Sequence, residues 1–120
     1  MSEKEQLINR YFQLSDEASK SQDALSAIIG LFANNATITS ATGESCTGIH
    51  AITVFFSAFF ERNVQLKHLC HVFVDNNEYK AEWAVSGRKK SGELFALHGY
   101  DTYEFNSANQ ITRLQVAIAR

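Results

Sequence analysis

The chain has 120 residues, of which 45% are hydrophobic and 20% charged, and its formal net charge is −2. This length favours a single domain over residues 1–120 with one core, and the apolar content excludes a disordered chain. The slightly acidic balance argues against a nucleic-acid surface, and no apolar run approaches the roughly 20 residues that cross a membrane.

Helices are predicted in the first half of the chain. Apolar residues at helical spacing indicate an amphipathic helix over 3–20. Asp23 is expected to cap a second, short helix that Asn34-Asn35 ends, and a short strand over 36–40 precedes a polar loop over 42–48. Phenylalanines repeating at intervals of three and four predict a third helix over about 49–62.

Strands are predicted in the second half, where apolar residues alternate with a period of two. The expected strands cover 64–74, 79–88, 93–105 and 110–119, and turns are expected at Asn76-Asn77, Ser91-Gly92 and 107–109. Four consecutive strands suggest an antiparallel meander, with the three helices covering one side of it.

The other side of the predicted sheet is too apolar to face open water. Its residues are Leu69, His71, Phe73, Ala84, Leu94, Ala96, His98 and Tyr100. Because large exposed apolar patches mark interaction surfaces, we expect a second copy of the chain to cover this side as a homodimer.

Three polar side chains interrupt the apolar rows. Asp101 lies in the apolar row of its strand, His68 is the ionisable group of another row, and Tyr11 lies on the apolar stripe of the first helix. A buried carboxyl is costly unless it is paired or protonated, so these groups could converge on a small-molecule site with apolar walls. Burial would raise the pKa of Asp101 and keep it able to donate a hydrogen bond.

Structural interpretations of the same residues stay open from sequence. Asp101 could satisfy backbone donors or pair with His68, and His68 could be an ordinary core histidine. Tyr11 is equally compatible with plain core packing, and side chains such as Trp83 and the phenylalanines of the third helix are more often core residues than ligand contacts.

Other chemistries find little support in the sequence. Two cysteines, Cys46 and Cys70, are too few for a disulfide framework, and the polar start of the chain lacks the apolar core of a secretory signal, so a cytoplasmic protein is expected. His68 and His71 are three apart on a predicted strand and point to opposite faces. With no metal-binding or phosphate-loop motif, neither a metal nor a cofactor is expected.

Three segments together resemble the SnoaL-like/NTF2-like superfamily, which includes ketosteroid isomerase-like and polyketide cyclase-like domains. They are Ile29-Gly30-Leu31-Phe32-Ala33-Asn34-Asn35-Ala36-Thr37-Ile38, then Thr47-Gly48-Ile49-His50-Ala51-Ile52 with Phe55-Phe56, and Gly99-Tyr100-Asp101-Thr102-Tyr103-Glu104-Phe105 with Gln110-Ile111. The resemblance implies an α+β cone, in which three N-terminal helices pack on a curved, mostly antiparallel sheet. It also implies dimerisation through the outer face of the sheet.

Function is less constrained by this resemblance, because the superfamily contains isomerases, cyclases, dehydratases and non-catalytic binding domains. Tyr11 and Asp101 match the two oxyanion donors of ketosteroid isomerase, while Ser40 stands where that enzyme has its general base. A neutral hydroxyl cannot take a carbon-bound proton without a base of its own, so steroid isomerisation is not expected.

Apart from an interaction domain that binds a different protein through the outer face of the sheet, the sequence leaves two functions open. The first is a cofactor-free isomerase, cyclase or dehydratase acting on an apolar carbonyl or hydroxyl compound in the cone, with Asp101, Tyr11 and His68 as its acid–base groups. The second is a non-catalytic ligand-binding or dimerisation module. Six further residues are expected to line the ligand site: Ser40, Phe55, Phe59, Trp83, Tyr103 and Val116.

Overall fold

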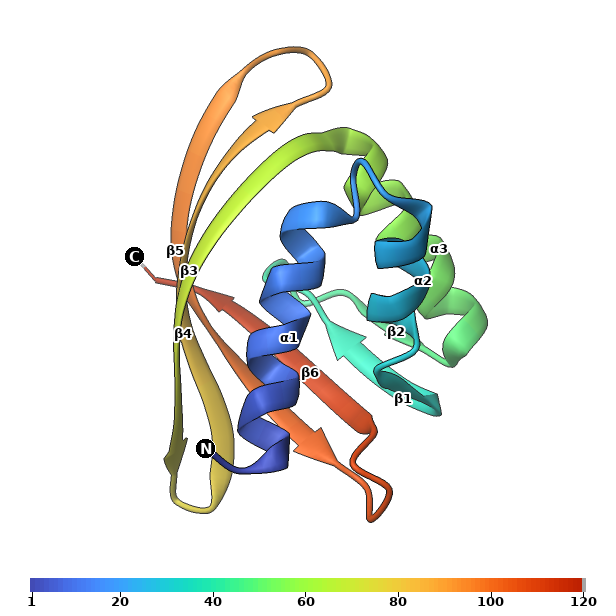
Figure 1. Ribbon diagram of the computed structural model, residues 1–120, viewed down its shortest axis with the longest axis vertical. Helices are drawn as coiled ribbons and strands as arrows, with labels where there is room; N and C mark the ends of the chain where they lie inside the picture. The colour runs from blue at the N-terminus through green and yellow to red at the C-terminus, as the bar shows by residue number, and fades with distance from the viewer. Residues whose placement is uncertain (120) are drawn as a thin grey trace.

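Three helices pack on one face of a six-stranded sheet in the computed structural model, which describes residues 1–119 (Figure 1). In chain order the elements are α1 (Glu3–Glu17), α2 (Gln22–Ile29), β1 (Phe32–Thr39), β2 (Ser45–Thr47), α3 (Ile49–Arg62), β3 (Asn63–Asp75), β4 (Glu78–Lys89), β5 (Leu94–Phe105) and β6 (Ile111–Ile118). The predicted α+β cone with N-terminal helices is confirmed.

The sheet is open and mixed, with the strand order β2-β1-β6-β5-β4-β3. Strands β3 to β6 form the predicted antiparallel meander. The sheet is mixed because β1, which lies between β2 and β6, pairs with β6 in parallel. This curved sheet presents an inner face to the helices and an outer face away from them (Figure 1).

The turns between the long strands contain residues in the left-handed backbone conformation, with positive φ. Asn76 and Asn77 both have positive φ, 51° and 65°, as expected of the two central residues of a tight hairpin. Gly92 (φ 95°) and Asn109 (φ 58°) take the same role in the next two turns. All three turns lie where the sequence places them.

Several of the predicted boundaries were wrong: the first helix ends at Glu17 rather than at residue 20, and the first strand begins at Phe32 rather than at residue 36. Ser21 caps α2, since its hydroxyl accepts the backbone N–H of Ala24 at 3.1 Å, and Asp23 lies inside the helix. The helix ends at Gly30, and Asn34 and Asn35 belong to β1 rather than to a helix end. The polar loop predicted over 42–48 contains the short strand β2.

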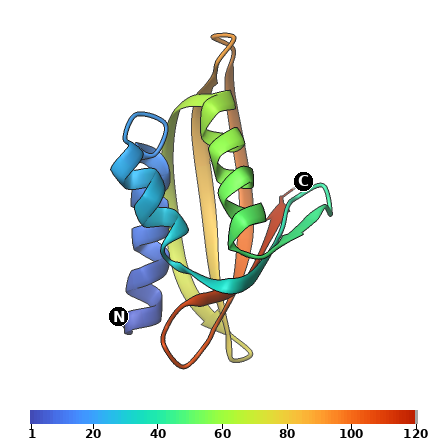
Figure 2. The ribbon, with the colours of Figure 1, turned by 90° about the vertical axis from the view of Figure 1, so that its right-hand side faces the viewer.

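The core lies between the helices and the inner face of the sheet. Fully buried side chains come from every layer, including Ile8 of α1, Ile28 of α2, Phe56 of α3 and Leu114 of β6. Figure 2 shows α1 with α2 on one side and α3 on the other, both in front of the strands. Among residues 1–119, none of the helices is long and apolar enough to cross a membrane.

Candidate functional site

Asp101 lies in the middle of β5 on the inner face, and only 3% of it is exposed. Its carboxylate accepts two hydrogen bonds from neighbouring aromatic side chains. The Trp83 indole donates to Oδ1 at 2.9 Å, and the Tyr103 hydroxyl donates to Oδ2 at 2.7 Å. The acid that interrupts an apolar row is therefore buried and hydrogen-bonded through both oxygens.

Gly99 makes room for the indole that holds this carboxyl. A Cβ at Gly99 would lie 2.5 Å from the Trp83 ring and 2.4 Å from the carbonyl oxygen of Ala117. Both distances are shorter than carbon contacts allow, so only glycine lets Trp83 lie across β5. The sequence alone did not identify Gly99 as part of the site.

Burial dominates the acidity of Asp101. Removal from water raises the pKa of this carboxyl to about 7, although the hydrogen bonds from Tyr103 and Trp83 act in the opposite direction. Near neutral pH the group is therefore divided between its acid and its carboxylate form. A carboxyl in that range can give or take a proton under physiological conditions.

Tyr11 contributes a hydroxyl close to this carboxyl. Its pKa is raised, first by burial and second by the negative charge of Asp101, and its ring lies 5.9 Å from that of Tyr103. The hydroxyl has no hydrogen-bond partner within residues 1–119. Since no fully enclosed side-chain nitrogen or oxygen of that range lacks a partner, the largely buried Tyr11 hydroxyl keeps some contact with solvent and is free to bond a ligand.

His68 binds a different acid from the one that the sequence suggested. Its Nδ1 lies 2.6 Å from Oδ1 of Asp16 in α1, so the proposed pairing of His68 with Asp101 was wrong. The imidazole packs between the rings of Phe12 and Trp83, at centroid distances of 5.3 and 6.4 Å. Trp83 thus contacts His68 on one side and binds Asp101 on the other.

The expected ligand-lining residues fall into two groups. Trp83 and Tyr103 bind Asp101 directly, and Val116 is its partner on β6. The others lie farther out: Phe55 and Phe59 stack on each other along α3, and the Ser40 hydroxyl binds that of Thr42 at 2.8 Å beyond the end of β1. The structure therefore brings the first group to the carboxyl and leaves the second apart from it.

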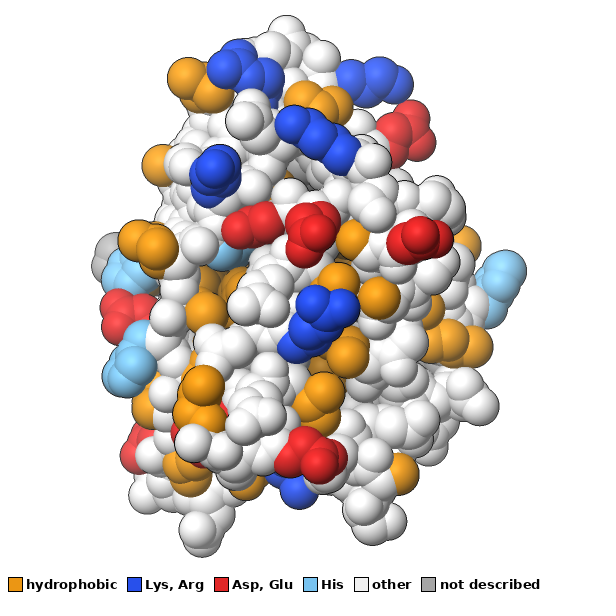
Figure 3. Space-filling model, in the orientation of Figure 1, with side chains coloured by type: hydrophobic (Ala, Val, Ile, Leu, Met, Phe, Trp, Pro, Cys, Tyr) orange, Lys and Arg blue, Asp and Glu red, His pale blue; other side chains and the backbone are white. Residues whose placement is uncertain are grey.

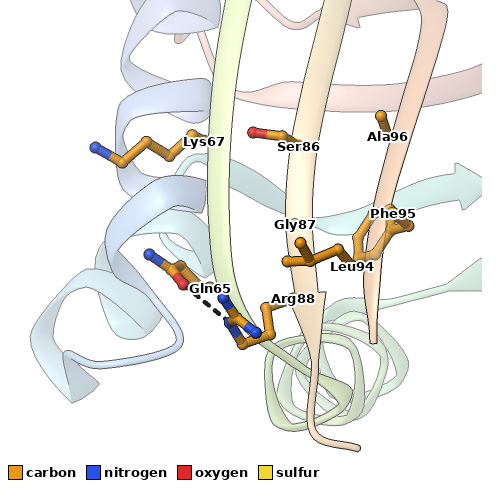
Figure 4. Close-up of a pocket in the computed structure, with 8 residues that line it drawn as sticks. All are labelled: Gln65, Lys67, Ser86, Gly87, Arg88, Leu94, Phe95 and Ala96. Atoms are coloured by element: carbon orange, nitrogen blue, oxygen red, sulfur yellow. Dashed lines mark hydrogen bonds between the residues drawn. The ribbon is translucent and has the colours of Figure 1, made fainter. Parts of the chain in front are cut away.

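Two hollows open on the outer face of the sheet, away from Asp101. The larger, about 550 Å³, lies over β3, β4 and β5 (Figure 4) and is lined by Gln65, Lys67, Ser86, Gly87, Arg88, Leu94, Phe95 and Ala96. The smaller, about 240 Å³, lies nearer the middle of the same strands and includes His71, Glu82 and His98. Neither hollow reaches the Asp101 carboxyl.

Thiol and metal chemistry have little basis in the described part of the chain. Burial raises the pKa of both Cys46 and Cys70, which keeps these thiols protonated. The Cys70 thiol instead donates to Oδ1 of Asn9 at 3.3 Å. Across residues 1–119, no three His, Cys, Asp or Glu side chains are grouped to hold a metal ion.

Comparison with known proteins extends this description. The family model described as "SnoaL-like domain" matches residues 9–114. Among curated protein sequences, none matches the chain significantly.

Three solved structures share the fold. An NTF2-like protein of unknown function from Exiguobacterium sp. 255-15 is 26% identical, with 93% of this chain and 97% of that one covered and a TM-score of 0.86. An epoxide hydrolase/cyclase-like enzyme with a role in pyran ring formation in polyether salinomycin is 15% identical, with coverages of 97% and 90% and a TM-score of 0.80. A Mycobacterium tuberculosis protein in complex with estradiol-17beta-hemisuccinate is 21% identical, with 88% of both chains covered and a TM-score of 0.70.

Proposed function

Because the chain belongs to the SnoaL-like domain family, we propose that it binds a small, largely apolar carbonyl or hydroxyl compound on the inner side of its sheet. The observation that carries this proposal is the buried Asp101 carboxyl beside the unpartnered Tyr11 hydroxyl. Apolar walls with a few polar groups at one point are the usual form of a small-molecule site. Because the two hollows described above lie on the outer face, a ligand that reaches Asp101 would have to open space between the helices and the sheet.

The chemistry that fits these groups is cofactor-free proton transfer. In its acid form Asp101 donates a hydrogen bond or a proton to a ligand oxygen, and the Tyr11 hydroxyl is a second donor. His68 is the proton acceptor in this proposal, because its ring lies 6.4 Å from that of Trp83, which binds Asp101. An isomerisation, cyclisation or dehydration needs no more than such a donor pair and an acceptor.

Two structural relatives support the ligand class. One holds a steroid ester, and the other acts in the formation of a pyran ring, so both handle largely apolar, oxygen-bearing molecules. Their low identity to this chain shows a shared fold, and function on a shared fold depends on the residues of the site. The proposal therefore rests on Asp101 and Tyr11 and takes only the ligand class from the relatives.

A binding experiment tests the proposal directly. Estradiol-17beta-hemisuccinate and other fused-ring ketones and alcohols would be screened by thermal unfolding, where a ligand at about 100 times its Kd adds about 2.7 kcal/mol. We expect a binding compound to shift the NMR signal of the Trp83 indole N–H and to bind at least tenfold more weakly to Tyr11→Phe. Tyr100→Phe is the matched control, because that tyrosine lies on the outer face beside Glu82. Equal affinities for the two variants would contradict the proposal.

A second candidate function is a non-catalytic binding or dimerisation module. Four aromatic rings surround Tyr11 with centroids 5.3 to 6.3 Å away, those of Phe12, Phe32, Phe56 and Tyr103. Such packing favours a rigid interior over one arranged for turnover. A ligand that binds near Trp83 and is recovered unchanged after long incubation would favour this second function.

The outer face of the sheet supports a further proposal, that the chain forms a homodimer through it. Leu69 is 80% exposed and Leu94 is 68% exposed on this face. Hydrophobic side chains and histidines gather at its edge in Figure 3. A second copy of the same face would remove these side chains from water.

A further inference from the structure

Asp16 lies at an electrostatically unfavourable position in α1. It lies in the last turn of the helix next to Glu17, and that turn contains no basic residue. The C-terminal end of a helix carries partial negative charge, so two acids there weaken the helix. Such a residue is expected to have a compensating contact elsewhere in the fold.

That contact is with one residue, His68. Oδ1 of Asp16 lies 2.6 Å from the His68 Nδ1, and both carboxylate oxygens lie 3.1 Å from its backbone N–H. These contacts join α1 to β3, the edge strand of the sheet, across 52 positions of the chain. Backbone and ring are held together, so the imidazole has little freedom to turn.

The contact also decides which ring nitrogen carries the hydrogen. A carboxylate only accepts hydrogen bonds, so Nδ1 must be the donor and the lone pair of the neutral ring lies on Nε2. Nε2 has no hydrogen-bond partner within residues 1–119. Since no buried side-chain nitrogen of that range lacks one, Nε2 is open to solvent.

We propose that Asp16 is a positioning residue, which holds His68 in the Nδ1–H form with Nε2 as the proton acceptor of the site. The inference rests on the proposed function for the role of Nε2. It adds a residue that the sequence analysis did not identify, and it explains why an acid lies at this end of α1. Asp16 itself touches no ligand and acts through the histidine.

The form of the ring can be measured on the full chain without a substrate. Protein labelled with ¹⁵N-histidine would be examined by long-range ¹H–¹⁵N NMR at about pH 8, above the ordinary histidine pKa of about 6.5. We expect the His68 Nδ1 to show the shift of a protonated nitrogen and Nε2 that of a bare one. In Asp16→Asn the amide can donate to Nδ1, so the hydrogen is expected to move to Nε2.

Glu17→Gln is the matched control, because it removes an exposed acid from the same helical turn and should leave the His68 spectrum unchanged. Two results would overturn the inference: a wild-type His68 with its hydrogen on Nε2, or a ring form that Asp16→Asn does not change. If Asp16→Asn fails to fold, the wild-type spectrum alone decides between the two forms.

Turnover separates this inference from the proposed function. With any substrate that the protein converts, Asp16→Asn should lower the rate by about 10²–10⁴-fold, the usual contribution of a general base, while Glu17→Gln should not. If no compound is converted, the proposed catalysis is contradicted. The NMR experiment still tests which nitrogen of the His68 ring carries the hydrogen. An unchanged rate in Asp16→Asn would remove Asp16 from the mechanism even where the ring form is as expected.

Discussion

Two opposing effects act on the pKa of the Asp101 carboxyl. Two donors, the indole of Trp83 and the hydroxyl of Tyr103, favour the charged carboxylate, whereas removal from water favours the neutral acid. Burial is the larger effect, which places the pKa of Asp101 at about 7. A small change in surroundings, such as an arriving ligand, can therefore change the protonation of this group.

This balance makes stability depend on pH in a defined direction. Below about pH 4 the Asp101 carboxyl is protonated in both the folded and the unfolded chain. Between its ordinary pKa of 3.8 and the folded value of about 7, the unfolded chain loses the proton first, so the free energy of unfolding falls as pH rises. We expect Asp101 to cause a loss of about 3–5 kcal/mol over this window.

Urea unfolding of the wild type and of Asp101→Asn, measured from about pH 4 to pH 8, checks this expectation. The amide cannot ionise, so the variant should lack this part of the pH dependence. Its stability at any one pH is not informative, because its amide nitrogen must meet one of the two donors. Parallel pH profiles for both proteins would contradict the raised pKa.

Loss of the hydroxyl should destabilise the protein at Tyr103 but not at Tyr11. The Tyr103 hydroxyl is buried and bound to Asp101, so Tyr103→Phe leaves a buried oxygen without its donor and should cost about 1–3 kcal/mol. The Tyr11 hydroxyl has no partner within residues 1–119, so Tyr11→Phe should change stability by less than about 0.5 kcal/mol. Chemical denaturation of the two variants measures the contrast, and similar losses would show that the Tyr11 hydroxyl is structural.

Sequence patterns identified some of these residues and not others. Asp101 could be found because an acid in an apolar row is costly and so requires a reason. Asp16 could not, because a polar residue on a helix normally faces water, and its partner His68 lies 52 positions away. Contacts of this kind depend on how α1 is placed against β3, which no local pattern contains.

At the scale of elements, β4 and β5 are fitted to each other through two glycines. Gly99 accepts the Trp83 ring, and Gly87 accepts the Phe95 ring, each in the place of a missing side chain. The two glycines differ in the atoms that an added Cβ would meet. An added Cβ at Gly99 meets the backbone oxygen of Ala117 at 2.4 Å, while at Gly87 it meets only side-chain atoms of Phe95 and Leu66.

Gly99→Ala should therefore be the more damaging substitution. A backbone oxygen cannot turn aside, so we expect a cost of about 3 kcal/mol or more and a displaced Trp83 that no longer binds Asp101. Gly87→Ala should cost about 1 kcal/mol, because the Phe95 ring can turn away. Thermal unfolding gives the stabilities, and the indole N–H signal reports the hydrogen bond. Equal costs would mean that β5 and β6 separate to admit the methyl group.

The elements themselves were largely predictable, because period and turn chemistry are local. Alternation located β3 to β6, and the Asn76-Asn77 pair located their first turn. The parallel pairing of β1 with β6 was not predictable, since it joins segments more than 70 residues apart. The short β2 was missed because three residues are too few to show a period.

The whole molecule has two unequal sides. Helices bury the inner face of the sheet, whereas the outer face carries exposed Leu69, near the hydrogen-bonded pair of His98 and Glu82, and exposed Leu94 toward the start of β5. The His98 Nε2 lies 2.7 Å from the Glu82 carboxylate, so these two polar side chains bind each other. The exposed leucines are the part of this face that a second copy of the chain would remove from water.

We therefore expect a homodimer built on this face. A stable interface buries about 800 Å² from each partner, which the outer sides of four neighbouring strands can supply. Leu69 lies halfway along β3, in register with Ala84 on β4, so Leu69→Lys would place a cation in the contact. Light scattering at micromolar concentration should give a dimeric mass for the wild type and a monomeric mass for Leu69→Lys.

Val54→Lys provides the matched control, because Val54 is 57% exposed on α3, on the opposite side of the molecule. It introduces the same charge in place of an exposed apolar side chain and should leave the dimer intact. The two variants together separate a specific contact from general hydrophobic association, which both substitutions would reduce. A monomeric wild type would show that the outer face meets another partner or none.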